Sequence, residues 1–109
     1  MKFLKNALGS AAIKSPKFDF GVAVTDKAMF AATAQVLEDT GVTAYLGQVG
    51  NIKQKGVLAA AGTIATVEAR HAAWIRFVNG DLPAPASFDK RKTEKTILKE
   101  VGATGFITG

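Results

Sequence analysis

Apolar residues recur at the three- and four-residue spacing of α-helices over most of this chain. The longest such stretch runs from Lys27 to about Val49 and follows two good N-cap residues, Thr25 and Asp26. A second stretch runs from about Gly56 to Val78 and ends at an Asn-Gly dipeptide, a typical helix stop. Because only a short turn at residues 51–55 separates the two stretches, they predict a long antiparallel helix hairpin.

Shorter segments flank this hairpin. Residues 2 to about 12 also have helical spacing, although so short a helix is marginal unless it packs against other elements. Pro16 disfavours helix in residues 15–21, which are expected to form an extended connector. After an irregular segment containing two prolines, Thr93 begins a short amphipathic helix that ends near Val101. The last eight residues are expected to dock as a tail, which completes an all-α prediction.

Length and composition narrow the functional classes. With 109 residues, the chain is expected to form a single domain over residues 1–109, which excludes a two-domain enzyme. The absence of cysteine excludes disulfides, thiolate metal sites and thiol catalysis. Although the net charge is +5, only Lys90, Arg91 and Lys92 are contiguous basic residues, so a basic nucleic-acid binder is the least favoured class and no nucleic-acid partner is expected.

Targeting signals give little information. No apolar run approaches the roughly 20 residues of a membrane-spanning helix, so no membrane span is expected. Lys5, Asn6 and Lys14 interrupt the N-terminal apolar residues, which argues against a signal peptide within this chain. The sequence leaves the compartment open.

The residues with the clearest chemical potential lie in the two long helical stretches. Glu68 and His71 are three residues apart, so both project from one face of the second helix. Apolar residues share that face, and Glu38 is likewise set among apolar positions on the first helix. All three side chains are therefore predicted to point into the core. Since burying unpaired carboxylates is costly, a metal cation is one explanation for their presence.

A plainer interpretation is that the two glutamates lie at solvated helix edges or pair with Arg70, Arg76 or a lysine. His71 would then be an ordinary half-buried imidazole. Spacing alone favours this interpretation, because two-residue matches of this kind are common by accident.

Several other positions are interpreted as packing residues. Tyr45 lies two turns after Glu38 on the same face, a position beside a metal or a radical, but packing with its hydroxyl in water is the favoured interpretation. Trp74, Phe77 and Val78 predict a core or interface patch. Gly41 and Gly47 are expected to allow close approach of another helix.

Two longer motifs identify a resemblance. The segments Leu37-Glu38-Asp39-Thr40-Gly41-Val42-Thr43-Ala44-Tyr45-Leu46-Gly47 and Ile64-Ala65-Thr66-Val67-Glu68-Ala69-Arg70-His71-Ala72-Ala73 closely resemble the ferritin-like domain family that includes the plant desiccation-related proteins. The resemblance continues through residues 83–89 and ends near Phe106. The start of the chain resembles the segment that follows the Glu-x-x-His motif of the family's second helix, so the whole resembles the C-terminal half of the domain.

The resemblance implies a metal site and a way to complete it. Ferritin-like carboxylate proteins take one Glu from each of two helices and a Glu-x-x-His motif from each of the other two. By this resemblance, Glu38 is a lone carboxylate ligand, and Glu68 with His71 forms one ligand pair. One chain then holds half of a site, and two copies of the hairpin could rebuild a full bundle as a homodimer or larger homo-oligomer.

The leading hypothesis is a ferritin-like four-helix-bundle half that binds iron or manganese through Glu38, Glu68 and His71. Carboxylate and imidazole ligands suit these metals, and no soft thiolate is present. An active site of this family would oxidise ferrous iron with dioxygen or peroxide, with Glu68 as the bridging carboxylate. The alternative is a non-catalytic structural or interaction module that keeps the bundle but binds no metal. Whether the protein is an enzyme stays open.

Overall fold

The computed structural model describes residues 2–109, with the side chains of Phe3, Leu4 and Ala7 excepted, and within them it is helical. Its elements, in chain order, are α1 (Lys2–Leu8), the 3-10 turns η1 (Gly9–Ala11) and η2 (Gly21–Val24), and the helices α2 (Lys27–Gln48), α3 (Lys55–Val78) and α4 (Glu94–Ala103). The described residues form no strand beyond one isolated antiparallel bridge, Phe18 with Ile107. The all-α prediction is confirmed.

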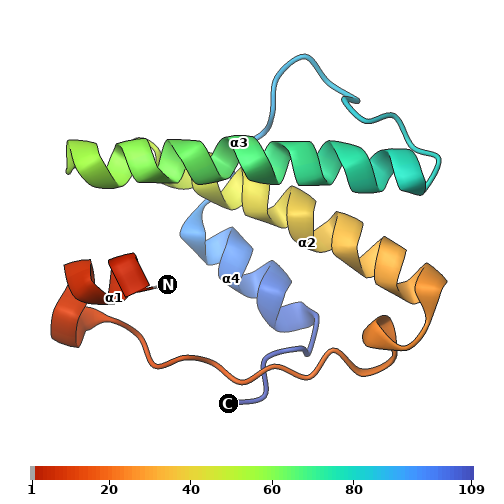
Figure 1. Cartoon of the computed structure of the whole chain (residues 1–109), viewed down its shortest axis with the longest axis horizontal. Coiled ribbons are helices and arrows are strands. Elements are labelled where there is room, and N and C mark those ends of the chain that lie inside the picture. The colour runs from red at the N-terminus through yellow and green to blue at the C-terminus, as the bar shows by residue number, and fades with distance from the viewer. Residues whose placement is uncertain (1) are drawn as a thin grey trace.

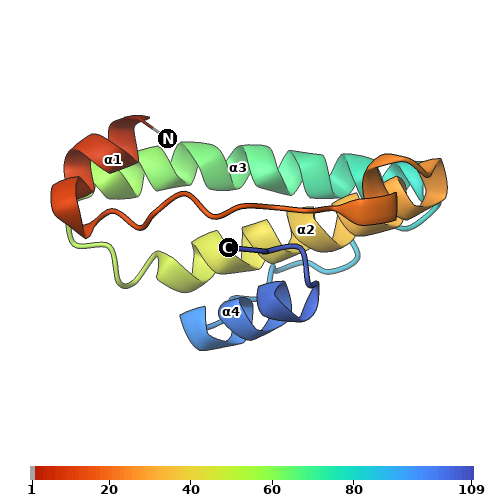
Figure 2. The same cartoon turned by 90° about the horizontal axis from the view of Figure 1, so that it is seen from below.

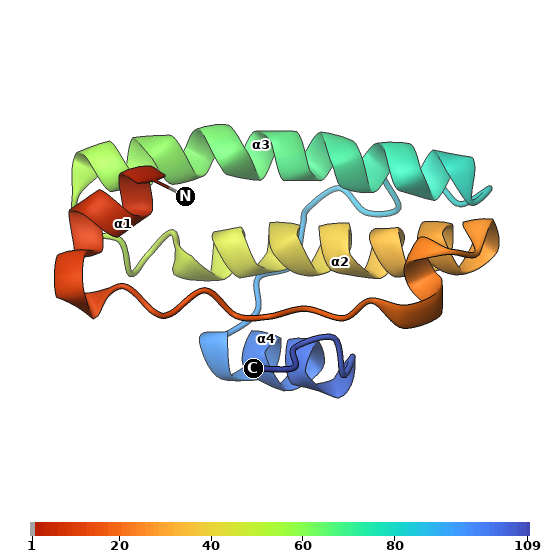
Figure 3. The ribbon, with the colours of Figure 1, turned by 60° about the horizontal axis from the view of Figure 1, so that its bottom comes forward.

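Helices α2 and α3 form the predicted antiparallel hairpin and lie side by side over most of their length (Figures 1 and 3). Asp26 caps α2, because its side chain accepts a hydrogen bond from the backbone N–H of Met29 at 2.8 Å. At the other end of the hairpin, α3 ends at Val78 and Asn79 is its C-cap. Gly80 follows with a φ of 81°, a conformation that glycine adopts at little cost. Local capping therefore sets both limits of the hairpin.

Polar contacts join the two helices near the end of α3. The guanidinium of Arg76 donates to both carboxylate oxygens of Asp39, with 3.0 Å between Nε and Oδ1. The side-chain amide of Asn79 donates to Gln35 at 2.7 Å. A bidentate charged pair of this kind fixes orientation as well as adding stability, so it sets how α3 lies on α2.

Residues 12–20, between η1 and η2, are extended, much as predicted for residues 15–21, and they run along one side of the hairpin (Figure 2). The C-terminal tail pairs with them, since the backbone N–H of Asp19 donates to Phe106 at 2.8 Å and that of Thr108 donates to Lys17 at 3.0 Å. The rings of Phe20 and Phe106 also lie 5.3 Å apart. The tail is therefore docked, as the sequence analysis expected.

Helix α4 begins where Thr93 caps it and packs against α2. The chain entering α4 lies so close to α2 that a Cβ at Gly47 would collide with the carbonyl of Lys92. Gly47 therefore permits close approach of a loop, whereas the sequence analysis expected a helix there. A Cβ at Gly41 would meet nothing within 4 Å, so the prediction of close packing at Gly41 is wrong in this chain.

The hydrophobic core is thin. Only Ala23, Val42 and Ala72 are buried apolar residues among those described. Trp74 and Phe77, expected to belong to a core or interface patch, are 68% and 62% exposed, so they are not core residues. No helix in the described part of the chain is long and apolar enough to cross a membrane.

Candidate metal centre

The three residues singled out by their spacing meet between α2 and α3. Glu38 lies midway along α2, while Glu68 and His71 lie midway along α3. His71 Nδ1 is 3.5 Å from Glu38 Oε2 and 3.7 Å from Glu68 Oε2. One ligand atom from each residue lies within 4.8 Å of the other two. Antiparallel packing thus brings together donors that are about 30 residues apart in the sequence.

These side chains lie at the edge of the helix interface rather than in a sealed core. The side chains of Glu38 and Glu68 are 30% and 28% exposed, and that of His71 is 56% exposed. All three side chains were predicted to point into the core, but each of them is only partly buried. All three groups therefore remain partly accessible to solvent.

The charges at this cluster are not balanced by basic side chains. Arg76, one of the cations expected to neutralise the glutamates, pairs with Asp39 instead. Among the residues that the structure describes, no lysine or arginine lies within 4 Å of either Glu38 or Glu68. Within the described part of the chain, the imidazole of His71 is the one basic group that meets both carboxylates. The interpretation in which Arg70, Arg76 or a lysine pairs with these glutamates is therefore wrong for the described chain.

A neighbouring negative charge and apolar surroundings both shift the pKa of the Glu38 carboxyl. Partial burial raises the pKa of the Glu38 carboxyl above its ordinary value of 4.5. A hydrogen bond with Glu68 and repulsion from its charge raise this pKa further, while His71 acts in the opposite direction. Burial and the neighbouring carboxylate therefore both disfavour the charged form of Glu38, and a bound cation would offset both effects.

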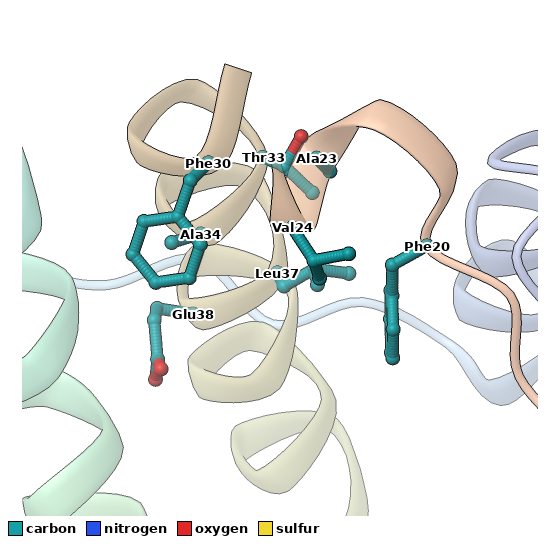
Figure 4. Close-up of a pocket in the computed structure, with 8 residues that line it drawn as sticks. All are labelled: Phe20, Ala23, Val24, Phe30, Thr33, Ala34, Leu37 and Glu38. Carbon is teal, nitrogen blue, oxygen red and sulfur yellow. The ribbon is translucent and has the colours of Figure 1, made fainter. Parts of the chain in front are cut away.

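The apolar surroundings of Glu38 form a pocket of about 260 Å³. The pocket lies between α2 and the chain that precedes it, with Phe20 and Val24 opposite Phe30 and Leu37 (Figure 4). Glu38 borders the pocket on the side of α3 (Figure 4). These apolar side chains exclude water from one side of the carboxylate, which accounts for the burial effect on its pKa.

Tyr45 belongs to the surroundings of the same site. Burial raises the pKa of its hydroxyl above 10.0, and the charge of Glu68 raises the pKa further. From the sequence, packing was favoured for Tyr45 over a place beside a metal, although its seven-residue spacing from Glu38 puts both residues on one helix face. A phenol near this carboxylate keeps its proton and stays a hydrogen-bond donor.

The donor set fits a hard or borderline metal ion. Two carboxylates and one imidazole offer oxygen and nitrogen ligands of the kind that iron and manganese accept. Three protein donors would leave further coordination positions open to water or to other ligands. The arrangement is thus a carboxylate–histidine cluster carried by an antiparallel helix hairpin.

Comparison with known protein families agrees with this description. The family model of the ferritin-like domain matches residues 1–81, which hold α1, α2, α3 and all three cluster residues. The chain therefore belongs to the ferritin-like domain family. The match ends before α4, so it does not include the resemblance noted at residues 83–89 and near Phe106. A search of curated proteins found no match.

Proposed function

We propose that this protein binds iron or manganese through Glu38, Glu68 and His71. The observation that carries the proposal is the convergence of one imidazole and two carboxylates within 4.8 Å, without a lysine or arginine beside the carboxylates in the described chain. Membership of the ferritin-like family supports it, because bundles of this type use a Glu and a Glu-x-x-His motif as ligands.

Each residue has a distinct role in this proposal. His71 supplies a nitrogen donor, and Glu38 supplies a carboxylate with apolar side chains along one side, which limit the access of water. Glu68 is proposed as the bridging carboxylate. With iron bound, the site would support oxidation of ferrous to ferric iron, with dioxygen or peroxide as the electron acceptor. Tyr45 keeps its hydroxyl proton near Glu68 and can donate a hydrogen bond.

The proposal also includes the branch of the family to which the chain belongs and its oligomeric state. The motifs at residues 37–47 and 64–73 resemble desiccation-related proteins, so we assign the chain to that branch of the family. We further propose that it supplies the half of the bundle that carries one lone Glu and one Glu-x-x-His motif, and that it acts as a homodimer or larger homo-oligomer. The exposed apolar residues support this last point, because large exposed patches commonly mark interfaces.

The competing candidate is a metal-free helical module that uses its surface to bind partners. The 56% exposure of His71 favours it, because metal ligands are usually held by surrounding side chains. Metal binding distinguishes the two candidates.

Thermal unfolding with and without metal tests the proposal. Under anaerobic conditions, Fe(II) or Mn(II) at about 100 times Kd should stabilise the fold by about 2.7 kcal/mol. In a domain of this size, that raises the melting temperature by roughly 10 °C or more. His71→Ala should abolish the rise, whereas Glu94→Gln, a change in α4 outside the cluster, should retain it. No rise in the parent would support the metal-free candidate, and an equal rise in His71→Ala would contradict the assignment of His71 as a ligand.

A further inference from the structure

The pocket beside Glu38 is apolar along its length and negatively charged at one end. Six of its eight lining residues are apolar, the seventh is a threonine, and Glu38 is the one that carries a charge. The Glu38 side chain borders the pocket at the end that faces α3 (Figure 4). A molecule that matches this lining has an apolar body and a single polar head.

The wall of the pocket opposite α2 is held in place by other parts of the chain. Ala23 in η2 is 5% exposed, and η2 packs against α2. The ring of Phe20 lies 5.7 Å from the ring of Phe18 and 5.3 Å from that of Phe106. The hydrogen bond from Asp19 to Phe106 ties the same segment to the C-terminal tail. The pocket is therefore already formed in the ligand-free chain, as most small-molecule sites are.

Several apolar side chains of the pocket remain in contact with water. Val24 is 65% exposed, Phe30 is 55% exposed and Phe20 is 36% exposed. A ligand in the pocket would remove part of this apolar surface from water, which favours binding. The volume of about 260 Å³ is below the roughly 300 Å³ at which pockets for drug-sized molecules begin. The pocket therefore suits one short aliphatic chain.

The carboxylate at the end of the pocket selects the head group of the ligand. In the described part of the chain, no lysine or arginine nitrogen lies within 4 Å of Glu38. An ammonium group offers a positive charge and three N–H donors, whereas an anionic head would be repelled by Glu38 and Glu68. A hydrated metal ion gains nothing from the apolar walls. A cation that carries an alkyl chain matches both the carboxylate and the walls.

We propose that this pocket binds a primary alkylammonium ion, with its alkyl chain between α2 and η2 and its ammonium group on the carboxylate of Glu38. The chain displaces water from Val24, Phe30 and Leu37, and the ammonium forms a charge-assisted hydrogen bond. This inference goes beyond the proposed metal site, because it uses Glu38 but requires no metal.

The first test is calorimetric titration of chelator-treated full chain at pH 7 with the series from propylammonium to hexylammonium. These amines are protonated at pH 7, like the side chain of lysine. Each added methylene should lower Kd about fourfold until the pocket is full. Hexanol and hexanoate, which keep the chain but change the head, should bind about 10-fold more weakly or worse. A Kd that does not depend on chain length, or equal binding of hexanol or hexanoate, would overturn the inference.

Two substitutions locate the binding site. Ala34→Leu places three more carbons in the pocket without changing a charge, so it should raise the Kd of hexylammonium about 10-fold or more. Ala32→Leu is the matched control, since Ala32 is an exposed residue of α2 outside the pocket lining, and it should bind like the parent. Glu38→Gln should remove the preference for hexylammonium over hexanol but keep the dependence on chain length. Equal Kd values for the two leucine variants, or an unchanged preference in Glu38→Gln, would overturn the assigned site.

The same titrations distinguish this inference from the proposed metal site, because they are run without metal. Hexylammonium binding in a protein that shows no thermal shift with Mn(II) would keep the pocket and overturn the metal site. A thermal shift with Mn(II) in a protein that binds no alkylammonium would keep the metal site and overturn the inference drawn from the pocket.

Discussion

Replacing Glu68 with glutamine should stabilise the metal-free protein and, at the same time, remove its stabilisation by metal. Glutamine keeps the size of the side chain but removes one of two negative charges in the cluster. The ligand oxygens of Glu38 and Glu68 lie within 4.8 Å of each other. The two effects therefore have opposite signs for one physical reason: the same charge repels Glu38 and attracts a cation.

The separation of the charges sets the expected size of the effect. Two unit charges 4.8 Å apart repel by about 0.9 kcal/mol in water and by about 3.5 kcal/mol at an effective dielectric constant of 20. Because the two side chains are 30% and 28% exposed, solvent screening favours the lower figure. We expect Glu68→Gln to gain about 1 kcal/mol, which corresponds to roughly 4–8 °C in melting temperature.

The gain should depend on pH in a defined direction. The pKa of Glu38 is raised in the folded state, chiefly by burial and then by Glu68, so the folded protein holds this proton more tightly than the unfolded chain does. Its contribution to stability is present below pH 4.5 and is lost as the pH rises through the higher folded-state pKa. In acid, Glu38 is protonated and the repulsion disappears. The advantage of Glu68→Gln should therefore be small in acid and full at pH 7.

The assay is thermal unfolding of chelator-treated protein from pH 4 to 8 at one protomer concentration. Glu94→Gln serves as control, because Glu94 lies in the first turn of α4 and should lose only about 0.3–1 kcal/mol of favourable helix-dipole interaction. If Glu68→Gln melts at or below the parent temperature at pH 7, or if its gain is the same at every pH, the reasoning about charge repulsion is refuted.

Three predictions concern the hairpin itself and are checked by urea unfolding. Gly47→Ala should destabilise the protein, because the added Cβ collides with the backbone before α4. In Gly62→Ala the added Cβ meets nothing within 4 Å, so helix propensity should raise the free energy of unfolding by about 0.5–1 kcal/mol. If both substitutions change stability in the same direction, this prediction is contradicted. Asp39→Ala should cost about 1–3 kcal/mol by leaving Arg76 without its partner, and an unchanged midpoint would show that the pair adds nothing. Asp26→Ala should cost about 1 kcal/mol through loss of the N-cap, and a neutral result would show that this end of α2 is frayed.

Helix boundaries were predictable because local signals determine them. The side chains of Asp26 and Thr93 cap the backbone a few residues away, and Gly80 adopts the left-handed conformation that ends α3. The cluster of Glu38, Glu68 and His71 was also accessible from the sequence, because helical spacing fixes the face on which each residue lies.

Other features depend on contacts that no local pattern records. The pairing of Arg76 with Asp39 depends on how the two helices are rotated against each other. Gly41 and Gly47 look alike in sequence, yet only Gly47 lies beneath another segment of the chain. The exposure of His71 depends on what covers the hairpin, and helical spacing identifies the face without showing its cover.

The central claim is that Glu38, Glu68 and His71 hold a metal ion, and counting bound ions tests it most directly. After anaerobic equilibrium dialysis against Mn(II), the metal content of the parent and of His71→Ala is measured at equal protein concentration. In the parent, we expect binding to saturate at about one ion per chain, the share of each half of a two-metal site, and we expect His71→Ala to retain little metal. Equal metal content in the two proteins, or none in the parent, would contradict it.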